Sequence, residues 1–318
     1  MILQLHFTSG YGILKLRKRG ELLMAEMKPL PIGVEDFKEL IEKEYYFVDK
    51  TLMIKDLLDK RSKVSLFTRP RRFGKTLNMS MIQRFFEKTG ESNAYLFEGL
   101  NISKTGQKYM QHQGRYPVIS VSLKSMKQAT YELAYETYKY IIKDEFRRHR
   151  AFIYHANVLD QEEQRRYDAF LDINASDSVY YKAIGFLSVC LERAYHKNVI
   201  ILIDEYDVPL ENSYFCGFYD KMIGLIRSVF ESALKTNPAL EFAVLTGCLR
   251  ISKESIFTGL NNLKVYSVTN NDFSEYFGFT QSEVESFAEF YSLSAEITEM
   301  KTWYDGYLFG RTEIYNPW

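Results

Sequence analysis

The segment "NVIILID", residues 198–204, restricts the fold of this chain more than any other feature. Its unbroken apolar core is mostly β-branched and leaves no polar face, which is typical of a strand covered on both sides in a parallel sheet. Other short apolar runs predict further strands, and stretches with apolar residues at helical spacing separate them. The predicted strands are 63–68, 117–123, 198–204, 240–247 and 264–269, and the clearest predicted helices are 75–88, 128–150, 179–195 and 220–235.

Alternating strands and helices predict an α/β fold. We expect a central parallel five-stranded sheet flanked by helices, followed by a C-terminal helical segment. Residues 1–27 are expected to be a peripheral extension, residues 28–275 the main domain, and residues 276–318 a helical lid or the start of a truncated C-terminal region. In such sheets ligands bind at the carboxyl ends of the strands, so a site is expected there.

Composition excludes several classes of function. The 41 Lys and Arg residues balance 41 Asp and Glu residues, so no overall charge draws the chain to nucleic acid or to a membrane. No apolar run reaches the roughly 18 residues of a membrane-spanning helix, and the N-terminus lacks the positive start of a secretory signal. Three scattered cysteines without metal-ligand spacing fit a reducing compartment. We therefore expect a cytoplasmic protein.

The segment "SLFTRPRRFGKT", residues 65–76, joins a predicted strand to a predicted helix. It ends like a phosphate-binding loop, but Arg69 stands where the full pattern has its first glycine, and the last three letters alone are compatible with chance. In the functional interpretation, backbone N–H groups face the phosphates, Lys75 supplies a mobile positive charge and Thr76 offers a hydroxyl to Mg²⁺. The residues expected to contact the phosphates are Arg72, Phe73, Gly74, Lys75, Thr76 and Leu77.

A second motif, "VIILIDEYD", ends a buried strand in two carboxylates. Asp204 is expected to hold Mg²⁺, and Glu205 to orient and deprotonate an attacking water. The alternative is a solvated strand end. Because the two motifs occur in the right order on strands of one sheet, we favour a nucleoside triphosphatase that uses ATP and Mg²⁺.

A third stretch, residues 245–263, begins where the fourth predicted strand ends. Thr246 is at the strand tip, in position to monitor the attacking water or the terminal phosphate, and Arg250 is expected to act on the same phosphate. The alternative is an ordinary connection between a strand and a helix. For Arg71 and Arg72 we favour an outward, solvated orientation over contact with nucleotide oxygens.

Together with "LPIGVEDFKELIEKEYYFVDKT", "YFGFT" and "WYDGYLFG…YNPW", these motifs resemble the AAA-ATPase-like family of bacterial and archaeal proteins, over residues 30–318. The resemblance implies that the arginine-rich loop entry is normal, and that ATP and Mg²⁺ bind as described. It also implies that residues 46–51, with Asp49, lie near the base or ribose. Many members continue into a nuclease domain. No nuclease constellation is evident here, so the chain is either an N-terminal fragment or lacks its nuclease partner.

Three functions stay open at this point. An ATP hydrolase would couple turnover to conformational change, and Glu205 favours it. A nucleotide-binding switch would hold ATP or ADP with negligible turnover, and the low glycine content of the loop favours it. An ATPase module of a DNA-processing protein rests on the family neighbours and on the basic segment 147–150. The expected partners are therefore ATP or ADP and a protein or nuclease domain beyond residue 318, with no membrane and with DNA unsupported by the net charge.

Overall fold

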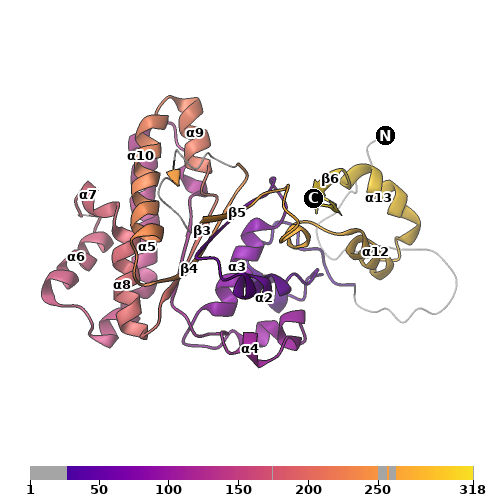
Figure 1. The fold of residues 1–318 in the computed structure, drawn as a ribbon, viewed down its shortest axis with the longest axis horizontal. Coiled ribbons are helices and arrows are strands. Elements are labelled where there is room, and N and C mark those ends of the chain that lie inside the picture. Colours follow the sequence, from indigo (N-terminus) through magenta and orange to yellow (C-terminus); the bar gives the residue numbers. More distant parts are fainter. Residues whose placement is uncertain (1–26, 174, 250–255, 258–262, 318) are drawn as a thin grey trace.

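The computed structural model describes residues 27–173, 175–249, 256–257 and 263–317. Five parallel strands form a sheet in the order β2-β3-β4-β1-β5 (Figure 1). The strands are β1 (Val64–Thr68), β2 (Val118–Ser122), β3 (Val199–Asp204), β4 (Leu240–Gly247) and β5 (Leu263–Tyr266). The α/β fold with a parallel five-stranded sheet is confirmed.

The last strand is shorter than predicted. It ends at Tyr266, whereas the prediction extended to residue 269. The backbone N–H and hydroxyl of Ser267 both donate to the Asn270 side chain, and the Asn270 N–H donates back to the Ser267 carbonyl. This local turn satisfies backbone groups that would otherwise continue the strand.

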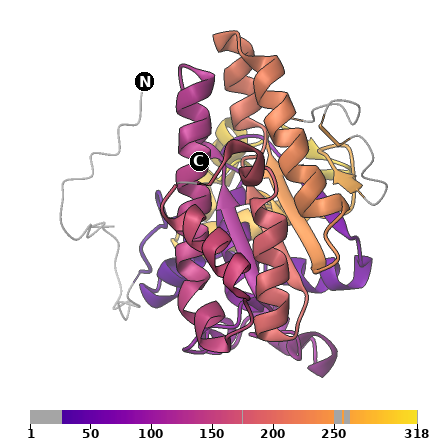
Figure 2. The same ribbon diagram turned by 90° about the vertical axis from the view of Figure 1, so that its left-hand side faces the viewer.

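Helices cover both faces of the sheet, as predicted. Alternate residues of β3 face two separate apolar clusters: Val199, Ile201 and Ile203 contribute to one, and Ile200 and Leu202 to the other. The first cluster includes α5, α8 and α10, which Figure 2 shows in front of the sheet, and the second includes α1, α2 and α3. The bounds are α1 (Phe37–Glu42), α2 (Leu52–Lys60), α3 (Lys75–Phe86), α5 (Tyr131–Ala156), α8 (Ala183–Tyr195) and α10 (Tyr219–Phe230).

Two of the predicted helices are interrupted in the structure. The helix expected at 179–195 is divided into α7 (Asp177–Tyr180) and α8, and the one expected at 220–235 ends as a π-helix, Glu231–Lys235. Among the described residues, the other helices before β5 are α4 (Gln107–Met110), α6 (Gln161–Leu171) and α9 (Val208–Cys216), with short 3₁₀ turns at Ala94–Phe97, Asn101–Lys104 and Lys124–Met126.

The C-terminal region, residues 273–315, lies on the same side of the sheet as α3 (Figure 1). It contains the expected helices, α12 (Gln281–Phe290) and α13 (Ile297–Tyr304), after a 3₁₀ turn at Ser274–Tyr276. It also contains an antiparallel pair that we did not predict, β6 (Tyr307–Phe309) and β7 (Thr312–Ile314). Strands this short carry too few residues for their alternation to be recognised.

Contacts cross the predicted domain boundary at residue 275. The buried Lys50 ammonium donates to the Glu275 carbonyl and to the Glu283 carboxylate of α12, each at 2.6 Å. The Tyr46 ring packs against Phe287, with ring centroids 5.3 Å apart. The division into residues 28–275 and 276–318 therefore stays a prediction, and residues 1–26 of the expected extension lie outside the described part of the chain.

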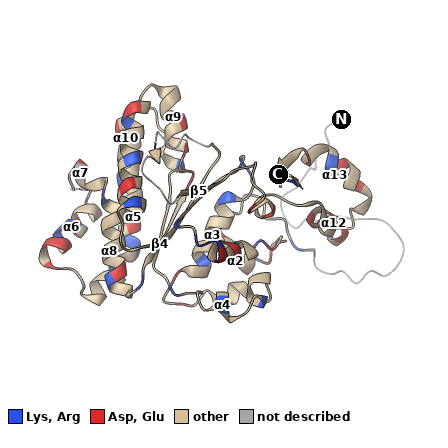
Figure 3. Ribbon diagram, viewed as in Figure 1, with Lys and Arg blue, Asp and Glu red and all other residues tan. Residues whose placement is uncertain are grey.

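Charges of both signs are distributed over the helices (Figure 3). In the part of the chain that the structure describes, no helix is both long enough and apolar enough to cross a bilayer.

Candidate functional site

The order of the strands brings the three sequence motifs to one edge of the sheet. Strand β4 lies between β1, which leads into the phosphate loop, and β3, which ends in the carboxylate pair. Thr246 of β4 is opposite Phe67 of β1, and the preceding Leu245 is opposite Ile203 of β3. Since neighbouring strands are about 4.8 Å apart, the loop and the carboxylates flank Thr246 at close range.

Asp204 is the centre of this arrangement. The Thr76 hydroxyl donates to one of its carboxylate oxygens at 2.7 Å, and the Thr246 hydroxyl donates to the other. The backbone N–H of Glu205 also donates to the second oxygen, at 3.0 Å. Three residues that the sequence predicted for the site therefore meet around the buried carboxylate of a fourth.

The start of α3 is open to an anion. Gly74 is the N-cap residue, with φ +75° and ψ 19°, and no side chain caps the helix. Glycine adopts this left-handed conformation without the steric cost that other residues bear. The first N–H groups of a helix have no partner within it, so an uncapped start suits phosphate oxygens. Of the next residues, Lys75 is buried, and Thr76 and Leu77 are partly buried.

Lys75 is folded back onto its own loop. Its ammonium donates to the carbonyls of Arg69 (3.1 Å) and Pro70 (2.8 Å) and lies 3.4 Å from the Cys248 sulfur. Among the described residues no carboxylate forms an ion pair with it. Glu205 and Asp207 interact with its positive charge through space, without a direct ion pair.

Glu205 combines partial burial with an unusual backbone conformation. It is half-buried, and its φ of +52° is uncommon for a residue with a side chain, which is a feature found at functional sites. Burial and the neighbouring Asp204 carboxylate raise the pKa of Glu205 above its ordinary value, while Lys124 and Lys75 oppose the shift. A raised pKa brings a carboxylate closer to the value at which a base works well near neutral pH.

Asp207 is a site residue that the sequence interpretation missed. It is 1% exposed, and one carboxylate oxygen accepts the N–H groups of Cys248 (2.8 Å) and Leu249 (2.7 Å). The Tyr206 hydroxyl donates to the Leu249 carbonyl at 2.6 Å. Tyr206 and Asp207 therefore fix the position of Cys248 and Leu249, which follow β4. The only signal in the sequence was a third acidic residue in "DEYD".

Gly247 permits this close approach, which gives a testable prediction. A Cβ atom at Gly247 would lie 2.5 Å from the Tyr206 ring and 2.6 Å from the Asp207 carboxylate, and both side chains are buried. We expect Gly247→Ala to reduce the free energy of unfolding by about 1–3 kcal/mol, the usual cost of overpacking.

The matched control is Gly224→Ala in α10, where a Cβ atom would meet nothing within 4 Å. This change should leave stability unchanged or raise it by up to about 1 kcal/mol, because alanine favours helices over glycine. Denaturant unfolding measures both variants. Equal effects from the two would contradict the close packing at Gly247.

The arginines of the loop separate into two environments. Arg71 and Arg72 are exposed, in agreement with the outward orientation that we favoured, and Arg71 is 3.2 Å from Glu211 of α9. Phe73 and Arg69 are instead buried against the C-terminal region. A buried arginine at the first glycine position was not foreseen.

Asp49 was predicted for the site, but its carboxylate is engaged elsewhere. One Asp49 oxygen accepts the N–H and hydroxyl of Thr51, and the other accepts the Asn101 N–H at 2.7 Å. Its carboxylate thus holds the start of α2, and a place near the base or ribose stays a prediction. Arg250 lies outside the described residues. Of the stretch 255–262, only Ile256 and Phe257 are described, and both are buried.

The residues of the basic segment 147–150 have different environments. Arg148 forms ion pairs with Glu87 and Glu145, and the buried His149 ring is 3.3 Å from Glu145. Arg147 is paired with Asp144 at 3.3 Å. Arg147 and Arg150 are exposed, and a DNA-processing module stays one of the open alternatives.

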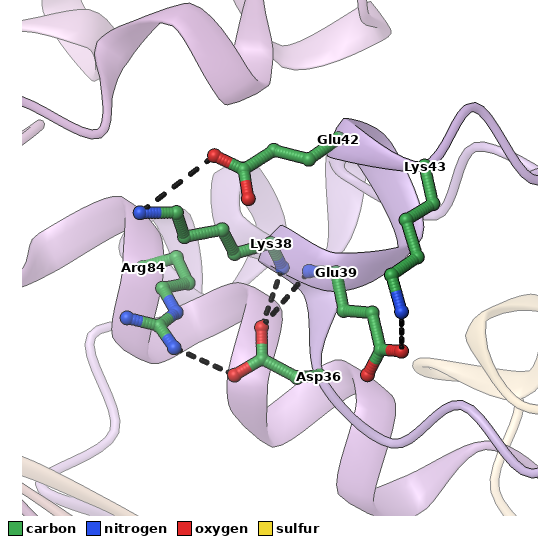
Figure 4. A pocket seen from close by; sticks show the side chains of 6 residues that line it. All are labelled: Asp36, Lys38, Glu39, Glu42, Lys43 and Arg84. Atoms are coloured by element: carbon green, nitrogen blue, oxygen red, sulfur yellow. Dashed lines mark hydrogen bonds and ion pairs between the residues drawn. The ribbon is translucent and has the colours of Figure 1, made fainter.

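A shallow depression between α1 and α3 also has a charged lining (Figure 4). Its side chains form ion pairs with one another, and Arg84 is in the last turn of α3, at the opposite end from Lys75. The pairs are Arg84–Asp36, Lys43–Glu39 and Lys38–Glu42. The depression needs no ligand to satisfy these charges and lies away from the phosphate loop.

A parallel sheet with this strand order and a phosphate loop after β1 defines a P-loop nucleoside triphosphatase fold. A family model described as "Predicted AAA-ATPase" matches residues 31–257, and the chain belongs to this family. This chain is 28% identical over 292 residues to the "Uncharacterized protein in vnfD 5'region" of Azotobacter chroococcum mcd 1. That match covers 91% of this chain and 50% of the relative, so the chain spans about half the relative's length.

Proposed function

We propose that this chain is a Mg²⁺-dependent ATPase that couples its nucleotide state to a conformational change. The observation that carries the proposal is the convergence of Thr76, Thr246 and Glu205 on Asp204, beside the uncapped helix that Lys75 begins. Membership of a predicted ATPase family supports ATP as the nucleotide.

The residues present fit a magnesium ion that is shared with a nucleotide. Within the described ranges, no cluster of three or more His, Cys, Asp or Glu side chains would hold a metal alone. Mg²⁺ commonly takes one or two protein oxygens and completes its shell with water and phosphate. Thr76 and Asp204 supply such oxygens, and Mg²⁺ bound there would neutralise charge on the phosphates.

The other residues have distinct roles in this proposal. Lys75 would pair with phosphate oxygens, and the N–H groups from Arg72 to Leu77 would cradle them. Glu205 would orient a water molecule and accept its proton. Thr246 would hold Asp204 in place and monitor the water or the terminal phosphate, and we retain Arg250 as a proposed contact of that phosphate.

Hydrolysis is favoured over a switch with negligible turnover because of Glu205. A protein that only binds nucleotide needs no base, yet this carboxylate is half-buried with a raised pKa beside Asp204. Steady-state phosphate release, with and without Mg²⁺ and with and without DNA, tests the proposal. We expect release that requires Mg²⁺. Nucleotide binding without any release would favour the switch, and release that requires DNA would favour a DNA-processing module.

A matched pair of variants at Thr76 tests the metal assignment. Thr76→Val removes the hydroxyl at nearly constant volume, and Thr76→Ser keeps it. We expect Thr76→Val to lose about tenfold or more of the gain in ATP affinity that Mg²⁺ gives, since a bond to a charged group is worth about 1.5–3 kcal/mol. Thr76→Ser should retain most of it. Isothermal titration with and without Mg²⁺ measures this, and equal behaviour of the two variants would exclude Thr76 from the metal site.

A further inference from the structure

Arg69 is a fully buried cation at the entrance of the phosphate loop. Its guanidinium donates to the carbonyls of Thr68 (3.0 Å), Tyr266 (2.7 Å) and Phe273 (3.3 Å). Burial lowers the pKa of Arg69 to about 10. Burying a guanidinium among neutral acceptors is costly, whereas an apolar side chain would fill the same volume without that cost.

The rings around Arg69 come from the C-terminal region. The guanidinium carbon lies 4.9 Å from the centre of the Phe277 ring and 5.1 Å from that of Phe309, within the range of cation–π contacts. Phe73 of the phosphate loop enters the same group, with its ring 4.8 Å from Tyr307 and 5.2 Å from Phe309. We call Phe277, Tyr307 and Phe309 the aromatic cradle.

Further contacts extend this attachment along the loop and the helix. A Cβ atom at Gly278 would lie 2.8 Å from the Phe73 ring, so the backbone of the C-terminal region closes tightly over that side chain. The buried Asn78 side chain of α3 donates to the Tyr276 carbonyl at 2.8 Å. Arg69 and Asn78 thus lie on either side of the residues proposed to contact phosphate, and Phe73 is one of those residues.

We infer that Arg69 is a positioning residue that couples the phosphate loop to the C-terminal region, residues 273–315, through the aromatic cradle. This inference rests on the proposed function. A ligand that stabilises one conformation of the loop also stabilises the residues of the C-terminal region that pack on that conformation. By the same linkage, a change in that packing alters the affinity for the ligand. Nucleotide binding therefore tightens the C-terminal region, and loosening the cradle weakens nucleotide binding.

The first test compares two buried phenylalanines of the same apolar cluster. Phe309→Leu removes part of the cradle and leaves the sequence of the phosphate loop unchanged. The matched control is Phe97→Leu, because Phe97 is equally buried and packs on Phe37 and Phe85 instead. We expect comparable losses of stability, but only Phe309→Leu should weaken ATP affinity, by about fivefold or more, the lower end of typical coupling between sites.

The second test uses hydrogen exchange on the full chain with and without ATP and Mg²⁺. Wild type should gain protection in peptides from residues 273–315. Arg69→Lys keeps a positive charge but loses the planar fork that reaches several carbonyls and stacks on rings. That variant should lose the gain in protection.

The outcomes separate the two proposals. Wild-type protein that binds ATP without any change in exchange in residues 273–315 would overturn the coupling and leave the ATPase proposal standing. So would equal losses of affinity from Phe309→Leu and Phe97→Leu. Absence of nucleotide binding in the wild type would overturn both.

Discussion

Glu205→Gln is expected to lower the rate of phosphate release by about 10²- to 10⁴-fold, the contribution of a positioned general base. Glutamine keeps the size and much of the hydrogen bonding of glutamate but cannot accept a proton from water. Binding of ATP should persist, since the proposed role of Glu205 involves water rather than the nucleotide. Titration and phosphate release on the same preparations measure the two effects separately.

The raised pKa of Glu205 adds a second readout. The folded protein binds this proton more tightly than the unfolded chain does, so stability falls as the pH rises from the ordinary glutamate value through the raised one. Above that window, the ionised carboxylate costs stability. Glu205→Gln should therefore leave the unfolding midpoint at pH 7 unchanged or raise it.

The same ionisation should control activity. In wild type, kcat/KM should fall on the acid side as Glu205 becomes protonated, with a midpoint above the ordinary value for glutamate. This acid limb should be absent from the residual activity of Glu205→Gln. A variant as fast as wild type would show that another residue is the base. A variant that loses stability together with turnover would point to a structural role.

Much of the sheet could be predicted because its signals are local. The apolar run of β3 is continuous in the chain, and the glycine, lysine and threonine of the loop are neighbours at the start of α3. Parallel strands carry their carboxyl ends to one edge, so the meeting of Thr76, Asp204 and Thr246 follows from the fold class. The hydrogen bonds among them confirm that meeting, while their roles toward a nucleotide stay predictions.

The unforeseen features depend on residues far apart in the chain. Arg69 looked like a departure from the loop pattern, because its cradle residues Phe277 and Phe309 follow more than 200 positions later. Asp207 meets Cys248 and Leu249 only because β3 and β4 are neighbours. Local periodicity contains no information on such contacts, so the sequence indicated the chemistry of the loop but not what holds it.

Lys75→Ala is expected to reduce ATP affinity by about 10- to 100-fold or more while the fold is retained. Among the described residues the ammonium contacts two loop carbonyls and the Cys248 thiol and forms no ion pair, so it is available to pair with phosphate oxygens. A charge-assisted hydrogen bond is worth about 1.5–3 kcal/mol, and the N–H groups of the loop do not replace a full charge. Titration with ATP measures the loss, and circular dichroism with denaturant unfolding checks the fold.

Arg71→Ala is the matched control, because Arg71 is a cation of the same loop. Its side chain is exposed and is paired with Glu211, so its removal takes away one surface ion pair worth about 0–1 kcal/mol. ATP affinity should therefore change little in Arg71→Ala. Equal losses in both variants would mean that the loop attracts the nucleotide through its general positive charge. An unchanged affinity in folded Lys75→Ala would remove the phosphate-loop interpretation, because the position of the Lys75 ammonium at the start of α3 is what distinguishes that loop from a basic turn.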